Sequence, residues 1–148
     1  MIELSGTVIT LDIFRCSVAV LVGPDKESIL KGIPKLYKRW GSGKDVIEHS
    51  IKKVKEVLND KEDDYQGTTI PDGVDALVIF LEKDISKISE EVAVHEMNHA
   101  MRHICRVHGV DDEETESYML EYLCNQFWTA QDDWNKKKKK HGKVENNK

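Results

Sequence analysis

Cysteine is scarce in this chain, and its three cysteines form no Cys-x-x-Cys pair. An odd number without that spacing argues against a disulfide framework and a cysteine zinc site, so Cys16, Cys105 and Cys124 should be free, buried thiols. Long apolar runs are also lacking: no window approaches the length of a membrane span, and no basic segment precedes an apolar one at the N-terminus. We therefore expect a soluble, cytoplasmic protein without membrane contact.

The chain has no excess of positive charge. Its 22 Lys and Arg residues stand against 27 Asp and Glu residues, a formal net charge of -5. This balance argues against a folded part that binds nucleic acid. Basic residues gather only near the C-terminus, at Lys136–Lys140 and Lys143. Because this stretch has no apolar periodicity, we expect residues 135–148 to be a basic, disordered tail.

A length of 148 residues suits one domain with one modest core, which we place at residues 1–134. Near its start, the β-branched stretches Thr7–Leu11 and Ser17–Val22 predict a pair of strands or one long bent strand. Two helices should follow. The first is capped by Asp25, runs toward Trp40 and is kinked or divided by Pro34.

The second helix is predicted at Asp45–Asn59, where apolar residues form one stripe opposite lysines and glutamates. Polar residues, glycines and a proline then predict a loop over Lys61–Gly73 that could border a cleft. The nearly continuous apolar run Val74–Leu81 is the strongest strand signal in the chain.

The last third of the chain predicts two helices. Ser86 or Ser89 can cap the first, which should end near His108, where Gly109 provides a stop. The second should begin after Asp112 and continue through Trp128 or as far as Trp134. Together these elements predict an α+β fold in which a short sheet packs against helices.

The first of these helices contains the sequence His95-Glu96-Met97-Asn98-His99, an HExxH motif. Two histidines four residues apart lie one turn from each other on the same helix face, so both can reach one cation. A carboxylate beside the first histidine can deprotonate a water molecule held there. The motif therefore predicts a zinc site (Zn2+) suited to hydrolysis. The alternative is a core helix whose histidines only form hydrogen bonds.

A catalytic zinc site needs a third protein ligand, which the motif does not supply. On the final helix, Glu116 lies one turn before Met119 and Leu120, within the apolar stripe. A carboxylate in that position is costly to bury unless it is paired or binds a metal, so we favour Glu116 as third ligand. Glu114 and Glu121 remain alternatives, because the register of the two helices is not fixed by the sequence.

Other histidines and one cysteine are weaker candidates. His103 continues the spacing of four from His99, but a third ligand on one straight helix usually overshoots the metal. Cys105 is better explained as a structural thiol, and His108 as a residue at the helix C-terminus. His49 and His141 have no partners in sequence and are expected at the surface.

The stretch from Val74 to Phe127 resembles the zincin-like metallopeptidases with a glutamate ligand, in particular the small members encoded by phages and prophages. The resemblance rests on the HExxH motif, the short turn at Gly109 and the Glu116-Ser117 pair followed by aromatic and aliphatic residues. It implies a small zincin-like domain, with an antiparallel C-terminal helix after the HExxH helix. It also implies zinc bound by His95, His99 and Glu116, with Glu96 as general base.

The resemblance further implies that the substrate is a peptide or protein. An extended substrate could pair with an exposed edge of the Val74–Leu81 strand. Tyr118, Tyr122 and His103 are candidate donors to the oxyanion. The alternative function is a non-catalytic interaction module or phage accessory protein on the same scaffold. The sequence does not indicate an oligomeric state.

Overall fold

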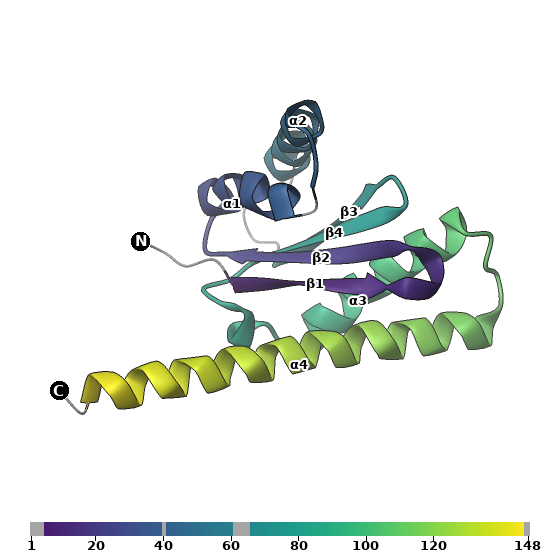
Figure 1. Ribbon diagram of the computed structural model, residues 1–148. Coiled ribbons are helices and arrows are strands. Elements are labelled where there is room, and N and C mark those ends of the chain that lie inside the picture. Colours follow the sequence, from purple (N-terminus) through teal and green to yellow (C-terminus); the bar gives the residue numbers. More distant parts are fainter. Residues whose placement is uncertain (1–4, 40, 61–65, 147–148) are drawn as a thin grey trace.

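The computed structural model describes residues 5–39, 41–60 and 66–146, which form three layers (Figure 1). A four-stranded sheet is the middle layer, with helices α1 and α2 on one face and α3 and α4 on the other. The α+β class is confirmed, and α4 runs back antiparallel to α3 (Figure 1). The elements are β1 (Ser5–Leu11), η1 (Asp12–Phe14), β2 (Cys16–Gly23), α1 (Lys26–Arg39), α2 (Lys44–Asp60), β3 (Gly67–Asp72), β4 (Asp75–Leu81), η2 (Ile85–Lys87), α3 (Glu90–Val107) and α4 (Glu113–Asn146).

The strand order of the sheet is β1-β2-β4-β3. β1 and β2 form an antiparallel hairpin, so the first apolar stretches are a pair of strands. β2 pairs with β4 in parallel, with Val20 opposite Val78, and β4 pairs with β3 antiparallel. The strand predicted at Val74–Leu81 is thus confirmed as β4, and it lies inside the sheet.

The two central strands are buried on both faces. Alternate residues of β2 and β4 point to opposite sides, so a strand covered by helices on both sides must be apolar at nearly every position. The side chains facing α3 and α4 are Val18, Val20, Val22, Ala76, Val78 and Phe80. Those facing α1 and α2 are Ala19, Leu21, Leu77 and Ile79. This explains the continuous apolar run seen in the sequence.

The layer formed by α1 and α2 matches the sequence prediction closely. Asp25 accepts a hydrogen bond from the backbone N–H of Ser28 at 2.7 Å, as expected of a helix cap. Pro34 lies inside α1, which continues to Arg39 without being divided. Trp40, the predicted end of this helix, lies outside the described residues. The second helix differs from its predicted bounds by one residue at each end.

The predicted loop at Lys61–Gly73 is wrong over its second half, where β3 forms an edge strand. Residues 61–65 lie outside the described part of the chain. Gly67 and Pro71 hid the strand, because both residues are depleted in strands. An edge strand tolerates proline, since one side of its backbone has no neighbouring strand to bond. Thr68 and Ile70 point inward and are buried, which is the alternation of a strand.

Local signals set the ends of α3. The Ser89 hydroxyl accepts a hydrogen bond from the backbone N–H of Val92 at 3.3 Å and caps the helix. Ser86 belongs instead to η2, where it is bonded to Asp84. Gly109 follows the helix with φ +70°, a conformation that glycine adopts without strain.

Helix α4 is longer than the sequence predicts and includes most of the basic stretch. It continues to Asn146, so the disorder expected for residues 135–148 is wrong over 135–146. Lysine is a good helix former, and a helix already started by packing is extended at little cost. Lys138 also forms an ion pair with the buried Asp84 at 2.9 Å. No helix in the described part of the chain is long and apolar enough to cross a membrane.

All three cysteines are free and buried, as predicted. Burial raises the pKa of each thiol, and a nearby carboxylate adds to the effect: Asp75 for Cys16, Glu116 for Cys105 and Glu90 for Cys124. These thiols therefore stay protonated near neutral pH and are poor nucleophiles and metal ligands.

We expect that Phe127→Ala lowers the free energy of unfolding by about 3–5 kcal/mol, because it leaves a cavity in the core. Phe127 is fully buried, and its ring centroid lies 5.5 Å from that of Phe80. Tyr118 lies on the same helix and is 63% exposed. Tyr118→Ala should therefore change the free energy of unfolding by no more than about 0.5 kcal/mol. Urea unfolding followed by circular dichroism measures both, and equal losses would contradict the packing described above.

Candidate metal centre

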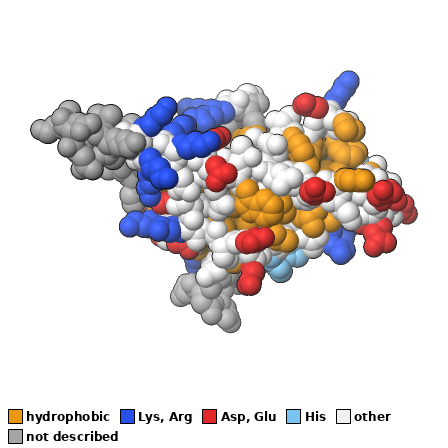
Figure 2. All heavy atoms as spheres, turned by 90° about the horizontal axis from the view of Figure 1, so that it is seen from below, with side chains coloured by type: hydrophobic (Ala, Val, Ile, Leu, Met, Phe, Trp, Pro, Cys, Tyr) orange, Lys and Arg blue, Asp and Glu red, His pale blue; other side chains and the backbone are white. Residues whose placement is uncertain are grey.

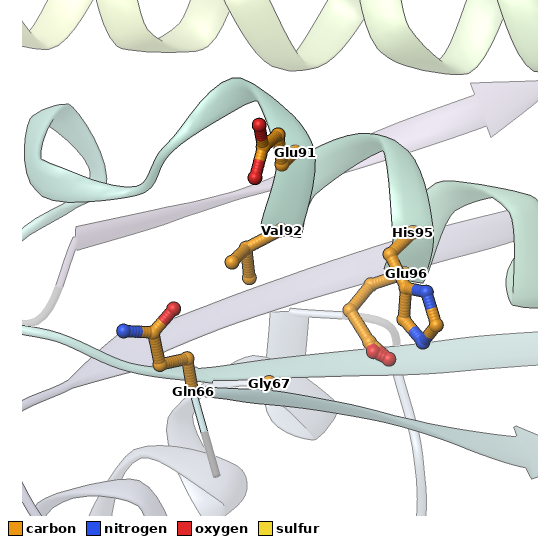
Figure 3. A pocket seen from close by; sticks show the side chains of 6 residues that line it. All are labelled: Gln66, Gly67, Glu91, Val92, His95 and Glu96. Atoms are coloured by element: carbon orange, nitrogen blue, oxygen red, sulfur yellow. The ribbon is translucent and has the colours of Figure 1, made fainter.

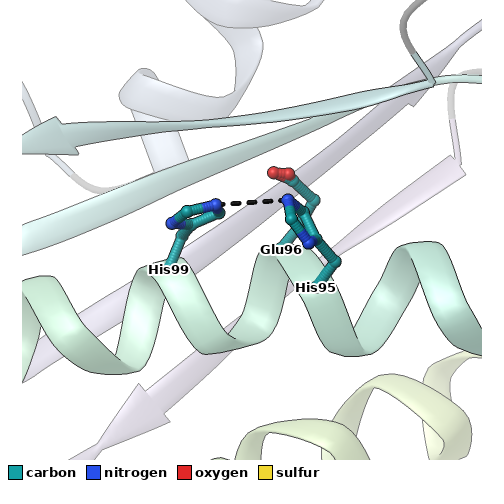
Figure 4. Close-up of side chains that lie close together, drawn as sticks. All are labelled: His95, Glu96 and His99. Atoms are coloured by element: carbon teal, nitrogen blue, oxygen red, sulfur yellow. Dashed lines mark hydrogen bonds between the residues drawn. The ribbon is translucent and has the colours of Figure 1, made fainter.

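The HExxH residues lie on α3 where this helix passes the edge strand β3. One face of α3 is buried in the core, with Met97, Ala100 and Ile104 fully inaccessible. His95 and His99 lie on the adjoining, exposed side of the helix. In Figure 4 the motif side chains point from α3 toward the strands, while α4 lies on the opposite side of α3.

The two motif histidines face each other. Their Nε2 atoms are 3.2 Å apart, and the ring planes are inclined at 83° (Figure 4). Such a contact needs a proton on one nitrogen, or a cation between the two. Two nitrogens that bind one tetrahedral zinc ion at about 2.0–2.1 Å lie about 3.3–3.4 Å apart. The observed separation is close to that value, so it is compatible with one metal ion shared by the two histidines.

Glu96 is only 4% exposed, although it neighbours an exposed histidine. Its side chain packs against Gly67 of β3 so closely that a Cβ atom on Gly67 would lie 3.0 Å from the Glu96 Cγ atom. Thr69 donates its hydroxyl to the backbone carbonyl of Glu96 at 3.1 Å and lies 3.4 Å from its carboxylate. Strand β3 thus fixes where this carboxylate sits.

The ligand atoms of His95, Glu96 and His99 all lie within 4.8 Å of one another. Two imidazole nitrogens and a carboxylate oxygen are donors that zinc accepts readily. The group could therefore hold a metal ion, as the motif predicted. A shallow pocket of about 420 Å³ adjoins it, lined by Gln66, Gly67, Glu91, Val92, His95 and Glu96.

Two hydrogen bonds fix the hairpin of β3 and β4 beside this site. The His103 Nε2 atom lies 2.9 Å from the carbonyl oxygen of Gly73 at the hairpin turn. On the other face of the sheet, the Tyr37 hydroxyl donates to Asp72 at 2.5 Å. Burial and this carboxylate raise the pKa of Tyr37, so its hydroxyl keeps its proton. His103 therefore holds the hairpin and is not part of the metal-binding group.

Glu116, the predicted third ligand, is not one of the three residues that form the possible metal-binding group in the described part of the chain. It lies near the start of α4, half-buried, and its charge acts on Cys105, six residues beyond His99 on α3. Glu114 and Glu121 instead line a surface depression at the start of α4, together with Tyr118. The third ligand thus stays a prediction, with Glu116, Glu114 and Glu121 as the alternatives.

The other histidines have structural or surface positions. His108 ends α3, as predicted: its Nδ1 atom lies 2.8 Å from the Ile104 carbonyl oxygen and its Nε2 atom 3.2 Å from that of Phe14. His49 is exposed on α2. The side chain of His141 lies outside the described residues.

Sequence reasoning missed the residues that β3 and the position just before it contribute to the site. Gln66, Gly67 and Thr69 have no motif that marks them, and they reach the site only because β3 pairs with β4 beside α3. Glu91 could have been found, because it precedes His95 by four residues and so shares its helix face.

We expect that His95→Ala and His99→Ala each weaken zinc binding by more than about 100-fold, since each removes a direct ligand. Zinc content after purification without chelator, followed by competition with a chromophoric chelator, measures the loss. His49→Ala, exposed on α2, is the control and should bind zinc like the parent. Unchanged zinc binding in both motif variants would exclude this centre.

The third ligand can be tested with the same assay. If Glu116 binds the ion, Glu116→Ala loses zinc while Glu114→Ala and Glu121→Ala keep it. Loss in one of the other two variants transfers the role to that residue. Retention of zinc in all three variants would exclude these three carboxylates as ligands.

No family model matches the chain, and neither a curated protein nor a solved structure matches it. Of the features behind the resemblance to the zincins, the HExxH-like group of His95, Glu96 and His99 is the one that the structure supports. The structure gives this motif a definite form, a His-Glu-His group on α3 that could hold a metal ion.

Proposed function

We propose that this protein is a zinc-dependent metallopeptidase, in which His95 and His99 bind the ion and Glu96 is the general base. The observation that carries the proposal is the position of the Glu96 carboxylate. It is buried beside two exposed histidines whose nitrogens face each other, and Glu96 and His95 both line a pocket. A purely structural zinc site has no need of such a carboxylate.

The zinc ion would supply Lewis-acid activation of water and of the peptide carbonyl. Glu96 has the role of moving the proton: it accepts one from the attacking water and passes it to the leaving amine. One water molecule is consumed and the carboxylate is regenerated. Because Gly67 and Thr69 restrict Glu96 on the side of β3, the carboxylate is already oriented before substrate binds.

Strand β3 is the best candidate for the surface that binds the peptide. The sequence-based choice, an edge of the Val74–Leu81 strand, is wrong, because β4 is paired on both sides. β3 is one of the two terminal strands of the described sheet, and it lies beside the motif helix. An extended peptide could add to it through backbone hydrogen bonds, which places a scissile bond near His95 and Glu96 without a deep side-chain pocket.

The candidate oxyanion donors receive little support. The Tyr122 hydroxyl donates to the backbone carbonyl of Thr10 on β1, and Tyr118 lies in the depression at the start of α4. The His103 Nε2 atom contacts the carbonyl of Gly73. We therefore assign the oxyanion to none of the three.

We expect that Glu96→Gln keeps zinc bound and lowers kcat for peptide hydrolysis by at least about 100-fold, because an amide cannot accept the proton. A quenched peptide library, read by mass spectrometry, measures hydrolysis, and zinc content is measured on the same samples. Glu90→Gln, a change of the same kind on the same helix, should retain activity.

Two results would contradict the proposal. Full activity in Glu96→Gln would exclude this residue as the base. Failure of the zinc-loaded parent to cleave any member of a broad library would favour a non-catalytic interaction module on the same scaffold.

A further inference from the structure

The pocket beside the metal-binding group extends past the motif toward the start of α3. Figure 3 shows its lining: Gln66 on one side, Glu91 on the other, Val92 between them, and His95 with Glu96 at one end. Its volume of about 420 Å³ could take one long side chain. The motif residues occupy only part of this lining, so the rest is free to contact substrate.

The polar groups of this pocket favour a cation. Glu91 supplies a negative charge, Gln66 supplies an amide oxygen, and neither lysine nor arginine is among the described residues that line the pocket. Within the described part of the chain no side chain pairs with the Glu91 carboxylate. Lysine and arginine side chains combine an apolar stem with a charged end, and Val92 offers an apolar wall for such a stem.

Glu91 lies on the same side of α3 as the histidines of the proposed reaction. It precedes His95 by four residues and His99 by eight, so all three lie along one side of α3. A cationic group held by Glu91 would therefore place the adjoining peptide bond near Glu96.

We propose that this pocket binds a positively charged group of the substrate and that Glu91 determines this preference. The charged group is a lysine or arginine side chain next to the scissile bond, or the amino terminus of the peptide. The proposal rests on the peptidase function proposed above.

A simpler role for Glu91 must be separated from this one. Acidic residues in the first turn of a helix stabilise it through the helix dipole, and Glu90 and Glu91 both occupy that turn. Glu90 does not line the pocket, and its charge acts on Cys124 of α4. Glu90→Gln is thus a matched control, which removes the same charge from the same turn but not from the pocket.

The test compares cleavage of paired peptides by the zinc-loaded parent, Glu91→Gln, Glu91→Lys and Glu90→Gln. Each pair carries arginine or its neutral analogue citrulline beside the scissile bond, with a free or an acetylated amino terminus. For an exposed carboxylate we expect the parent to prefer the charged member by about fivefold in kcat/KM. Glu91→Gln should abolish the preference, Glu91→Lys should reverse it, and Glu90→Gln should keep it.

The two amino termini distinguish the sources of the charge. If peptides with arginine are cleaved faster than those with citrulline, the pocket binds a side chain. If acetylation of the amino terminus removes the preference, the pocket binds the amino terminus. Cleavage by the parent with no charge preference, or with a preference that Glu91→Gln leaves intact, would overturn the inference but not the peptidase function. Loss of zinc in Glu91→Gln would also overturn it, because Glu91 would then be a metal ligand.

If the parent cleaves no peptide, the charge preference of the pocket can still be tested by a binding measurement. Nα-acetyl-arginine amide and Nα-acetyl-citrulline amide are titrated into the zinc-loaded parent, and the backbone amide signals of Gln66, Gly67 and Val92 are followed by NMR. Shifts caused by the arginine compound alone, and absent in Glu91→Gln, would support the cationic pocket without hydrolysis. Equal responses to both compounds would overturn it.

Discussion

The contact between helix α3 and the edge strand β3 is the constraint on which the proposed site depends. At this contact Glu96 is buried against Gly67, while Thr69 donates a hydrogen bond to the helix backbone. Burying a carboxylate without partners costs free energy, so a glutamate on a helix ordinarily faces solvent. Its inward position, beside two exposed histidines, is the observation on which the proposed role of this carboxylate as general base rests.

The rest of the fold keeps this contact in place. The core between the sheet and the helices α3 and α4 holds one face of the motif helix, with Met97 and Phe127 fully buried. The hairpin of β3 and β4 is held from both faces of the sheet, by His103 on one side and Tyr37 on the other. Helix α3 and strand β3 are each held in place by their own contacts. The carboxylate and the two histidines therefore keep their relative positions, and no loop has to hold them.

The sequence predicted those features of the site and fold that depend on short-range periodicity. Residues four apart on a helix share a face whatever surrounds them, and this sufficed to bring together His95 and His99. It could not place Glu116, because the face that α4 covers depends on the turn and on the packing of both helices. In the structure α4 covers the side of α3 opposite the motif histidines (Figure 4). The short strand at Gly67–Asp72 was missed for the same reason, since its identity comes from pairing with β4.

By itself, then, the sequence determined that a helix would carry two aligned histidines with a carboxylate beside the first, because that arrangement follows from the helical repeat alone. It also determined the central strands, whose apolar residues are needed wherever both faces of a sheet are covered. Only the tertiary structure decided which strand lies at the site and that Glu96 is buried there. It alone placed Gln66 and Glu91 in one pocket. The physical reason is that contacts between distant segments depend on the joint packing of strands and helices, which no local pattern encodes.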